Sequence, residues 1–217
     1  MIYIKPYKNF KMNESISNFD LSKLVTIIDI NEDDQGDWAY ITKDNRKLIL
    51  KKDQVGKISL VNDRLANHVN TGHPITKYFE LNDNNITYAA NFTVDGIILK
   101  EGRVYLIERR DGRGWAIPGG FIDAGETPEQ AVIRELNEET KLKPQDIIKI
   151  EPMGMFKTND PREIDFYSFP FLITIKDTAE LKYGDDAINS KWYLLSRAIK
   201  AKLAFTHHND FLSKVYY

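Results

Sequence analysis

The chain has 217 residues, of which 42% are hydrophobic and 12% aromatic, so a disordered polypeptide is excluded and a sizeable core can form. Its formal net charge of −2 provides no bulk attraction to nucleic acid or to an anionic membrane. The sequence has no cysteine, which excludes disulfides and thiolate metal sites and fits a cytoplasmic protein. We find no apolar run that resembles a signal peptide or a membrane span, so no membrane contact is expected.

Residues 1–84 are predicted to form a small β-rich module. Short runs of strand-forming residues, connected by turn formers, lie at residues 23–30, 37–42, 47–52 and 57–61. Residues 64–70 are expected to form a short helix or to end this unit. The polar stretch at residues 80–85 is interpreted as a turn, and it sets the boundary of the module.

Residues 85–217 are predicted to form a larger domain of the α/β class. A long strand or a pair of strands is expected at residues 86–100, and further strands are expected at residues 103–110, 147–157, 166–176 and 190–196. A loop rich in glycine and proline at residues 111–120 precedes a central helix, and residues 198–217 are expected to form a closing helical segment. Because strands flank one central helix, the chemistry is expected at loops and helix ends.

The central helix is predicted from its start signals. Thr127 fits the N-cap, Pro128 the first helical position, and Gln130 the third position of a capping box. With helical periodicity, Val132, Ile133 and Leu136 share an apolar arc, and Glu135, Glu138 and Glu139 share a different one. The apolar arc is expected to bury against a sheet, which leaves the acidic arc facing elsewhere.

The three glutamates on one arc disfavour helix formation. Like charges four residues apart destabilise a helix by a few tenths of a kcal/mol, and anions near its C-terminal end oppose the helix dipole. An acidic helix face is most often only solvated, but a cluster that costs stability in two ways indicates a functional site. Clustered carboxylate oxygens suit Mg²⁺ or Mn²⁺ bound together with substrate phosphates.

The residues around these glutamates follow a fixed spacing. Gly120 is followed after five residues by Glu126 and after seven more by Arg134, and the remaining positions are Glu135, Leu136, Glu138, Glu139 and Leu142. This pattern resembles the Nudix box, and its one departure is Lys141, which stands where the box has glycine. The sequence is therefore identified as a member of the Nudix hydrolase superfamily. We expect the Nudix fold, a mixed β-sheet sandwiched between helices.

The resemblance implies a role for each position of the box. The metal ligands would be Glu135, Glu138, Glu139 and the main-chain carbonyl of Gly119. The metal would activate water and neutralise charge on a diphosphate. Glu126 and Arg134 would pair and orient the loop against the helix, and Gly120 would allow the backbone to approach the substrate phosphate. The box does not identify the general base.

Further stretches of residues 86–217 resemble the ADP-ribose pyrophosphatase domain of bifunctional enzymes that also carry a nicotinamide mononucleotide adenylyltransferase. This resemblance implies hydrolysis of ADP-ribose to AMP and ribose 5-phosphate. Candidate substrate-binding residues outside the box are Arg109, Phe156 and Arg162, and Glu163 is a candidate base on a loop. For any one of these residues an ordinary surface role is about as well supported.

Several other residues near the predicted site have a plain structural explanation. Trp115 is expected to pack, and Asp185 and Asp186 either support the metal ligands or form a turn. A histidine pair such as His207 and His208 is more often a hydrogen-bonded structural element than a ligand.

Residues 1–84 do not resemble the adenylyltransferase, because they are too short for its nucleotide-binding unit. Their charges balance, with 12 Lys and Arg against 12 Asp and Glu, so a nucleic-acid partner is not expected. The module is expected to pair subunits or to cover the active site, and a homodimer is predicted.

Other substrates and one other class of function stay open. The alternatives are hydrolysis of NADH, of a dinucleoside polyphosphate or of nucleotide-capped RNA, and a non-catalytic sensor that binds ADP-ribose. The neutral module weakens the RNA alternative, and the intact set of glutamates favours turnover over sensing.

Overall fold

The computed structural model describes residues 19–56, 58, 63–72, 74–158, 165–184 and 186–216. Most of the strand predicted at residues 57–61 lies outside these ranges, as do the candidate residues Arg162, Glu163 and Asp185. No helix in the described ranges has both the length and the apolar character needed to cross a membrane.

The described residues form a mixed α/β structure dominated by strands. The strands are β1 Leu24–Glu32, β2 Trp38–Thr42, β3 Lys47–Leu50, β4 Ile75–Asn82, β5 Asn85–Lys100, β6 Arg103–Arg109, β7 Trp115–Ala116, β8 Gly119–Phe121, β9 Ile147–Pro152, β10 Phe156–Thr158, β11 Phe166–Ile175 and β12 Ala187–Leu194. The α-helices are α1 Asp63–Asn70, α2 Pro128–Thr140, α3 Leu195–Ala198 and α4 Thr206–Val215. The predicted α/β class is confirmed.

The first four strands form an antiparallel sheet. Strand β1 pairs with β2 on one side and with β4 on the other, and β2 also pairs with β3. The predicted strands that became β1, β2 and β3 are confirmed, as is the helix α1, but β4 was not predicted. Its sequence lacks a two-residue alternation because the four consecutive residues Thr76–Phe79 are all buried.

The turn predicted at residues 80–85 is shorter than expected. Strand β4 continues to Asn82 and β5 begins at Asn85, so only two residues connect them. Asp83 takes the left-handed conformation, with φ of 54°, which a tight β-hairpin turn requires and which Asp tolerates. The proposed domain boundary therefore falls in the turn of the β4–β5 hairpin, and the division into two domains stays a prediction.

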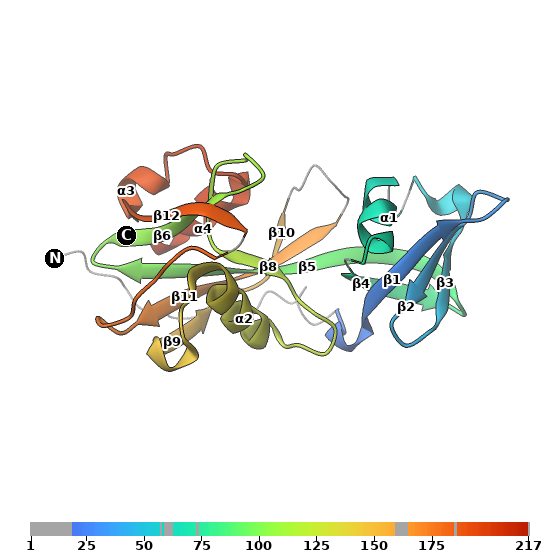
Figure 1. Ribbon diagram of the computed structural model, residues 1–217, viewed down its shortest axis with the longest axis horizontal. Helices are drawn as coiled ribbons and strands as arrows, with labels where there is room; N and C mark the ends of the chain where they lie inside the picture. The colour runs from blue at the N-terminus through green and yellow to red at the C-terminus, as the bar shows by residue number, and fades with distance from the viewer. Residues whose placement is uncertain are drawn as a thin grey trace.

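Strand β5 runs through nearly the whole length of the molecule (Figure 1). Its first residues pair with β4, its middle pairs in parallel with β11 and antiparallel with β8, and its last residues pair with β6. Residues 94–98 of this strand are all buried. A strand covered on both faces reads as a continuous apolar run, which explains its sequence.

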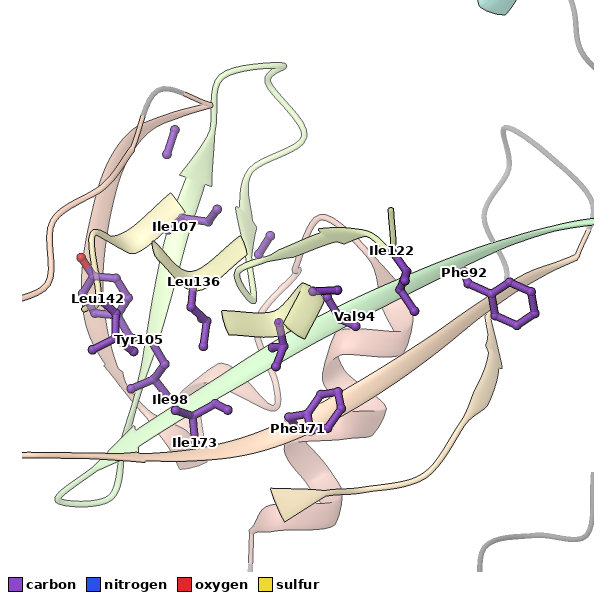
Figure 2. Packing of buried hydrophobic residues seen from close by; sticks show 14 of the residues in the cluster. Phe92, Val94, Ile98, Tyr105, Ile107, Ile122, Leu136, Leu142, Phe171 and Ile173 are labelled. Carbon is purple, nitrogen blue, oxygen red and sulfur yellow. The ribbon is translucent and has the colours of Figure 1, made fainter. Parts of the chain in front are cut away.

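Helices cover both faces of the sheet around β5. Val94 and Ile98 belong to a core cluster that includes Leu136 of α2, and the labelled side chains of this cluster pack together in Figure 2. Ile97, on the other face, belongs to a cluster that includes Phe211 of α4. This arrangement confirms the expected mixed sheet between helices. It also places α2 and α4 on opposite sides of the same strand.

An aromatic cluster joins the N-terminal sheet to the rest of the molecule. Phe19 lies between Tyr78 of β4, Phe92 of β5 and Tyr167 of β11, with ring centroids 5.4, 5.1 and 5.0 Å away. Contacts between aromatic rings at these distances contribute beyond simple burial. The N-terminal strands are thus tied to the larger domain by packing as well as by β5.

Candidate active site

Helix α2 begins with the predicted cap. Thr127 Oγ1 accepts a hydrogen bond from the Gln130 amide at 3.2 Å, and Gln130 Oε1 accepts one from the Thr127 amide at 2.9 Å. Pro128 occupies the first turn. On the inner face, Leu136 packs so closely on β5 that a Cβ added to Gly96 would lie 2.7 Å from its Cδ2. The cap and this contact fix the helix against the sheet.

The end of α2 is held by the loop that precedes β12. Lys141 has a φ of 55°, the left-handed conformation that glycine adopts more readily. The carbonyls of Glu139 and Thr140 accept hydrogen bonds from the Gly184 and Lys182 amides at 2.8 and 2.9 Å. A Cβ at Gly184 would lie 1.9 Å from the Glu138 carbonyl oxygen, so this loop passes directly beside the predicted metal ligands.

Arg134 binds several groups of the box at once. Its Nε and Nη2 donate to the two carboxylate oxygens of Glu126 at 2.8 and 2.9 Å, and Nη2 also donates to the carbonyl of Phe121 at 2.8 Å. Its Nη1 donates to Glu135 at 2.8 Å and to Glu138 at 3.2 Å. The pair that was expected between Glu126 and Arg134 is present, and it connects the loop to α2.

The charges of this network act on one another. The hydrogen bonds with Arg134 lower the pKa of Glu126 below its usual value, although burial opposes this. Hydrogen bonding to Glu126 raises the pKa of Arg134, which therefore stays charged. A two-point contact between a guanidinium and a carboxylate is among the stronger ion pairs, and its planar geometry fixes both partners.

Glu139 is buried and the side chain of Glu135 is only 12% exposed, whereas Glu138 is exposed. Burial raises the pKa of Glu135 to about 7, although Arg134 partly opposes the shift. Burial raises the pKa of Glu139 to about 8, although its oxygen accepts a hydrogen bond from the Gly119 amide at 2.8 Å. The side chain of Glu138 is 57% exposed. Two buried carboxylates in one place are unfavourable unless a cation compensates their charge.

The two glycines before the box leave no room for a side chain. A Cβ added to Gly119 would lie 2.1 Å from the Val94 carbonyl oxygen. A Cβ added to Gly120 would lie 2.3 Å from Glu135 Oε1. The backbone of β8 therefore runs directly between β5 and the carboxylates of α2, where a side chain would not fit.

The donors on α2 suit a hard divalent cation, but their carboxylates do not converge on one point. Glu135 and Glu138 contact Arg134, and Glu139 contacts the Gly119 amide. Within the described ranges, the one group of three acidic or histidine side chains whose donor atoms all lie within 4.8 Å is Asp95, His207 and His208. A carboxylate that accepts one hydrogen bond keeps further lone pairs, so these contacts still leave carboxylate oxygens for a cation.

Arg109 lies at the edge of this site. It is among the charges that act on Glu139, whose pKa it lowers in opposition to burial. Its side chain donates to Asp111 at 2.7 Å and lies over the ring of Phe205 at 5.4 Å. Burial tends to raise the pKa of Asp111, but hydrogen bonds from Arg109 and Arg113 outweigh it and hold that pKa at about 2. Arg109 is thus fixed close to the carboxylates.

Phe156 lies on the α4 side of the sheet. It lines an open pocket of about 440 Å³ together with Lys157, His207, Asp210, Phe211, Ser213 and Lys214. Its ring contacts that of Phe211 with centroids 5.3 Å apart.

Trp115 packs against neighbouring side chains, with Lys191 Nζ 4.1 Å from its ring centroid and the Tyr193 ring centroid 5.3 Å away. Asp186, another candidate, acts electrostatically on Glu139.

Asp95 and Ser168 are buried polar residues beside the site that were not predicted. Asp95 lies in the apolar middle of β5, where it accepts hydrogen bonds from His208 Nε2 at 3.0 Å and from the hydroxyl of Ser168. Burial raises the pKa of Asp95, but these contacts outweigh it and lower the pKa. A carboxylate inside an apolar strand is rare unless it is paired, and this signal in the sequence could have identified Asp95.

The chain matches known proteins over the larger of its two regions. A family model described as a NUDIX domain matches residues 90–215. An ADP-ribose pyrophosphatase of Methanocaldococcus jannaschii is 40% identical over 120 residues, covering 52% of this chain and 66% of that protein. An RNA pyrophosphohydrolase of Pseudoalteromonas translucida is 31% identical over 121 residues, covering 54% of this chain and 64% of that protein. This chain thus spans less than two thirds of the length of either relative.

Two solved structures are similar to part of this chain. A bifunctional NMN adenylyltransferase/ADP ribose pyrophosphatase of Francisella tularensis, complexed with AMP and a Mn ion, is 25% identical, with a TM-score of 0.48 over 58% of this chain and 40% of that one. The NUDIX domain of Shewanella oneidensis NrtR, complexed with ADP ribose, is 25% identical, with a TM-score of 0.49 over 58% of this chain and 85% of that one. Because the NUDIX family model covers more than half of the sequence, this chain belongs to the NUDIX family.

Proposed function

We propose that this protein hydrolyses ADP-ribose to AMP and ribose 5-phosphate with Mg²⁺ or Mn²⁺ as its metal. The observation that carries the proposal is the face of α2 on which the carboxylates of Glu135 and Glu139 lie directly against the Gly119–Gly120 backbone. The 40% identity with an ADP-ribose pyrophosphatase favours that substrate over other nucleoside diphosphate derivatives.

In this proposal the ligands on α2 are Glu135, Glu138 and Glu139, and the Gly119 carbonyl is a further ligand. A bound divalent cation would supply charge neutralisation at the diphosphate and lower the pKa of a bound water. Arg134 donates hydrogen bonds to Glu135 and Glu138. Through Glu126 it also joins α2 to the loop that precedes it. The protein therefore contributes the backbone at Gly119 and the carboxylates of α2.

The substrate-binding part of the proposal rests on Arg109, near the α2 carboxylates, and on Phe156, on the α4 side of the sheet. We propose that Arg109, whose charge acts on Glu139, binds a substrate phosphate. Phe156 lines the open pocket beside α4, whose aromatic and basic lining suits a nucleotide. Arg162 and Glu163 are kept as a substrate-binding residue and a candidate base, and both belong to a segment outside the described residues.

RNA 5′-end hydrolysis is the second candidate. Relatives called RNA pyrophosphohydrolases match this chain at 31% identity in P. translucida and at 45% identity over 99 residues in Francisella tularensis. Against this, the charged residues of the N-terminal module balance, so the module has no net positive charge to attract a polynucleotide.

A substrate panel with Mg²⁺ tests the proposal. The panel contains ADP-ribose, NADH, a diadenosine polyphosphate, nucleoside triphosphates and RNA with a triphosphate or a nucleotide cap. ADP-ribose is expected to give the highest kcat/KM, with AMP and ribose 5-phosphate as products. A clear preference for triphosphates or RNA would contradict the assignment, and calorimetric binding of ADP-ribose without product formation would indicate a sensor.

We also propose a homodimer and a cytoplasmic location. Ile28 of β1 and Leu81 of β4 are 44% and 37% exposed, and they give the N-terminal module apolar surface for a second copy. Light scattering during size exclusion is expected to give twice the chain mass for the wild type and a smaller mass for Ile28→Lys. A monomeric wild type would rule the dimer out.

A further inference from the structure

Asp95, His207 and His208 form a compact group on the side of β5 that faces α4. Their donor atoms lie within 4.8 Å of one another, as the ligands of a metal ion do. The side chains of His208 and Asp95 are 2% and 8% exposed, so both are cut off from water. The group is therefore either a metal site or a hydrogen-bonded support, and the hydrogen bonds of His208 distinguish the two.

The backbone fixes which nitrogen of His208 carries the proton. Nδ1 lies 3.1 Å from the Ile117 amide nitrogen and must accept its hydrogen bond, because an amide N–H can only donate. The proton of the neutral ring is then on Nε2, which donates to Asp95 Oδ1 at 3.0 Å. A metal ion needs the lone pair of Nε2, which is not available in this form. His208 is thus a support rather than a ligand.

The supported segment leads directly to the proposed metal site. Its three residues Ile117, Pro118 and Gly119 are each held by a different neighbour. The Ile117 amide donates to His208, the Pro118 carbonyl accepts from the Gly96 amide at 2.8 Å, and the Gly119 amide donates to Glu139 Oε2 at 2.8 Å. One end of the segment is therefore attached to α4 and the other end to α2.

The support extends from His208 to a third strand. Asp95 of β5 accepts from His208 with one carboxylate oxygen and from the hydroxyl of Ser168 in β11 with the other. Ser168 is completely buried. Each group in this series has its partner, and a satisfied buried network is rigid because breaking any bond leaves an uncompensated polar group.

We propose that Ser168, Asp95 and His208 are positioning residues that fix the Ile117–Gly119 segment, and through it the Gly119 carbonyl and the amide beside Glu139. The proposal rests on the proposed function, because the segment matters for activity only if α2 and Gly119 bind a metal. Residues that orient metal ligands from outside typically contribute about 10- to 100-fold to metal affinity or activity.

Two substitutions of His208 separate its two hydrogen bonds. In His208→Asn, the amide oxygen takes the place of Nδ1 and can still accept from Ile117. In His208→Gln, the amide nitrogen takes the place of Nε2 and can still donate to Asp95, but the Ile117 bond is lost. Leu212→Ala, also on α4 and fully buried, is the matched control because it weakens packing without touching either bond.

Three measurements follow these variants. The first is hydrogen–deuterium exchange of residues 115–121 without metal. The second is Mn²⁺ affinity by calorimetry, and the third is kcat and KM for ADP-ribose. In His208→Gln we expect faster exchange, Mn²⁺ affinity and kcat each lower by about 10-fold, and KM within about twofold of wild type. His208→Asn, which keeps the Ile117 bond but loses the Asp95 bond, is expected to show a smaller loss of Mn²⁺ affinity of about threefold, and Leu212→Ala to leave Mn²⁺ affinity unchanged.

Equal losses in the two His208 variants, or a loss in Leu212→Ala as large as in His208→Gln, would overturn the proposal. If His208→Gln does not fold, Ser168→Ala replaces it, and we expect about a threefold loss of Mn²⁺ affinity from this milder change; no loss would overturn the proposal. A wild type that binds no Mn²⁺ would contradict the proposed function instead. Faster exchange in His208→Gln alone would still support the network.

Discussion

The two helices that flank the Gly119 segment contact it in different ways. On the α2 side the segment contacts the carboxylate of Glu139, which is 8% exposed, and the charged side chains beside it are more exposed, at 26% for Arg134 and 57% for Glu138. On the α4 side, His208 and Asp95 are almost fully buried. Exposed ion pairs exchange partners at small cost, whereas buried hydrogen bonds do not. The α2 side is therefore suited to binding a ligand, and the α4 side to holding the backbone still.

The largest effect is expected from Glu139→Gln, which breaks the binding side alone. Removing a proposed metal ligand should lower kcat for ADP-ribose by about 100-fold or more. The melting temperature should not fall, because a neutral amide is easier to bury than a carboxylate whose pKa is raised to about 8. Steady-state kinetics and thermal unfolding measure the two effects.

Glu129→Gln is the matched control for this variant. Glu129 lies on the same helix and is exposed, and its replacement by Gln removes the same charge as Glu139→Gln does. Its kcat should equal that of the wild type within about twofold, as for most surface substitutions. Retained activity in Glu139→Gln, or equal losses in both variants, would show that the acidic face is not the metal site.

A smaller effect is expected from Arg134→Lys, which keeps the charge but removes the two-point contact with Glu126. Lysine cannot bind two carboxylate oxygens and the Phe121 carbonyl at once. We expect kcat to fall by about 10-fold and the free energy of unfolding by about 1 to 2 kcal/mol. Arg103→Lys, at an exposed position of β6, should change neither quantity. A wild-type kcat in Arg134→Lys would contradict the proposed connecting role.

Lys141→Gly should increase stability. Lys141 has a φ of 55°, where glycine avoids a strain of about 1 kcal/mol. Urea unfolding should show a gain of this size with unchanged kcat, because Lys141 contacts none of the proposed ligands. Lys143→Gly is the control, since its φ of −81° requires no glycine, and it should not stabilise the protein. A loss of stability in Lys141→Gly would contradict the assigned conformation.

The smallest effect is expected at Asp111, an exposed ion pair at the edge of the binding side. Its folded pKa of about 2 lies below the usual value, so its ionised form stabilises the protein near neutral pH, and this contribution is lost as pH falls toward 2. Asp111→Asn should lower stability at pH 6 by less than about 1 kcal/mol, because solvent screens the pair. Unfolding at pH 6 and at pH 2 should show the difference disappear.

Asp177→Asn provides the comparison for this pH dependence. The Asp177 side chain is 94% exposed, and its contact with Lys100 is longer, at 3.4 Å. Its stability should match the wild type at both pH values. A difference for Asp111→Asn that persists unchanged at pH 2 would mean that its ion pairs are not responsible.

The binding side of the site could be predicted from the sequence because its signals are local. The cap at Thr127, the apolar arc through Leu136 and the acidic arc through Glu139 all repeat within one helix, and the Glu126–Arg134 pair spans eight residues. Helical periodicity and capping rules read such patterns directly. The box thus indicated both the helix and the loop before it.

The supporting side could not be predicted because its contacts join distant residues. His208 and Ile117 are 91 residues apart, and Ser168 and Asp95 are 73 apart. No periodic pattern records such pairs. Strand β4 was missed for a related reason, since Lys77 is buried in it and hydrogen-bonds to Asn91 of β5, so its sequence does not alternate. In both cases a buried polar residue was stabilised by a partner that only the fold supplies.

Strand β5 determines where this chain can be divided. The hairpin turn before Asn85 is the obvious place to cut, yet Asn85, Ile86, Tyr88, Ala89 and Ala90 all pair with β4. A protein shortened at the turn would begin with an unpaired strand edge, which is a template for aggregation. A shortened protein that contains only the larger domain should begin near Asn91, where pairing with β11 begins. Any exchange of the N-terminal module for another must therefore carry the first part of β5 with it.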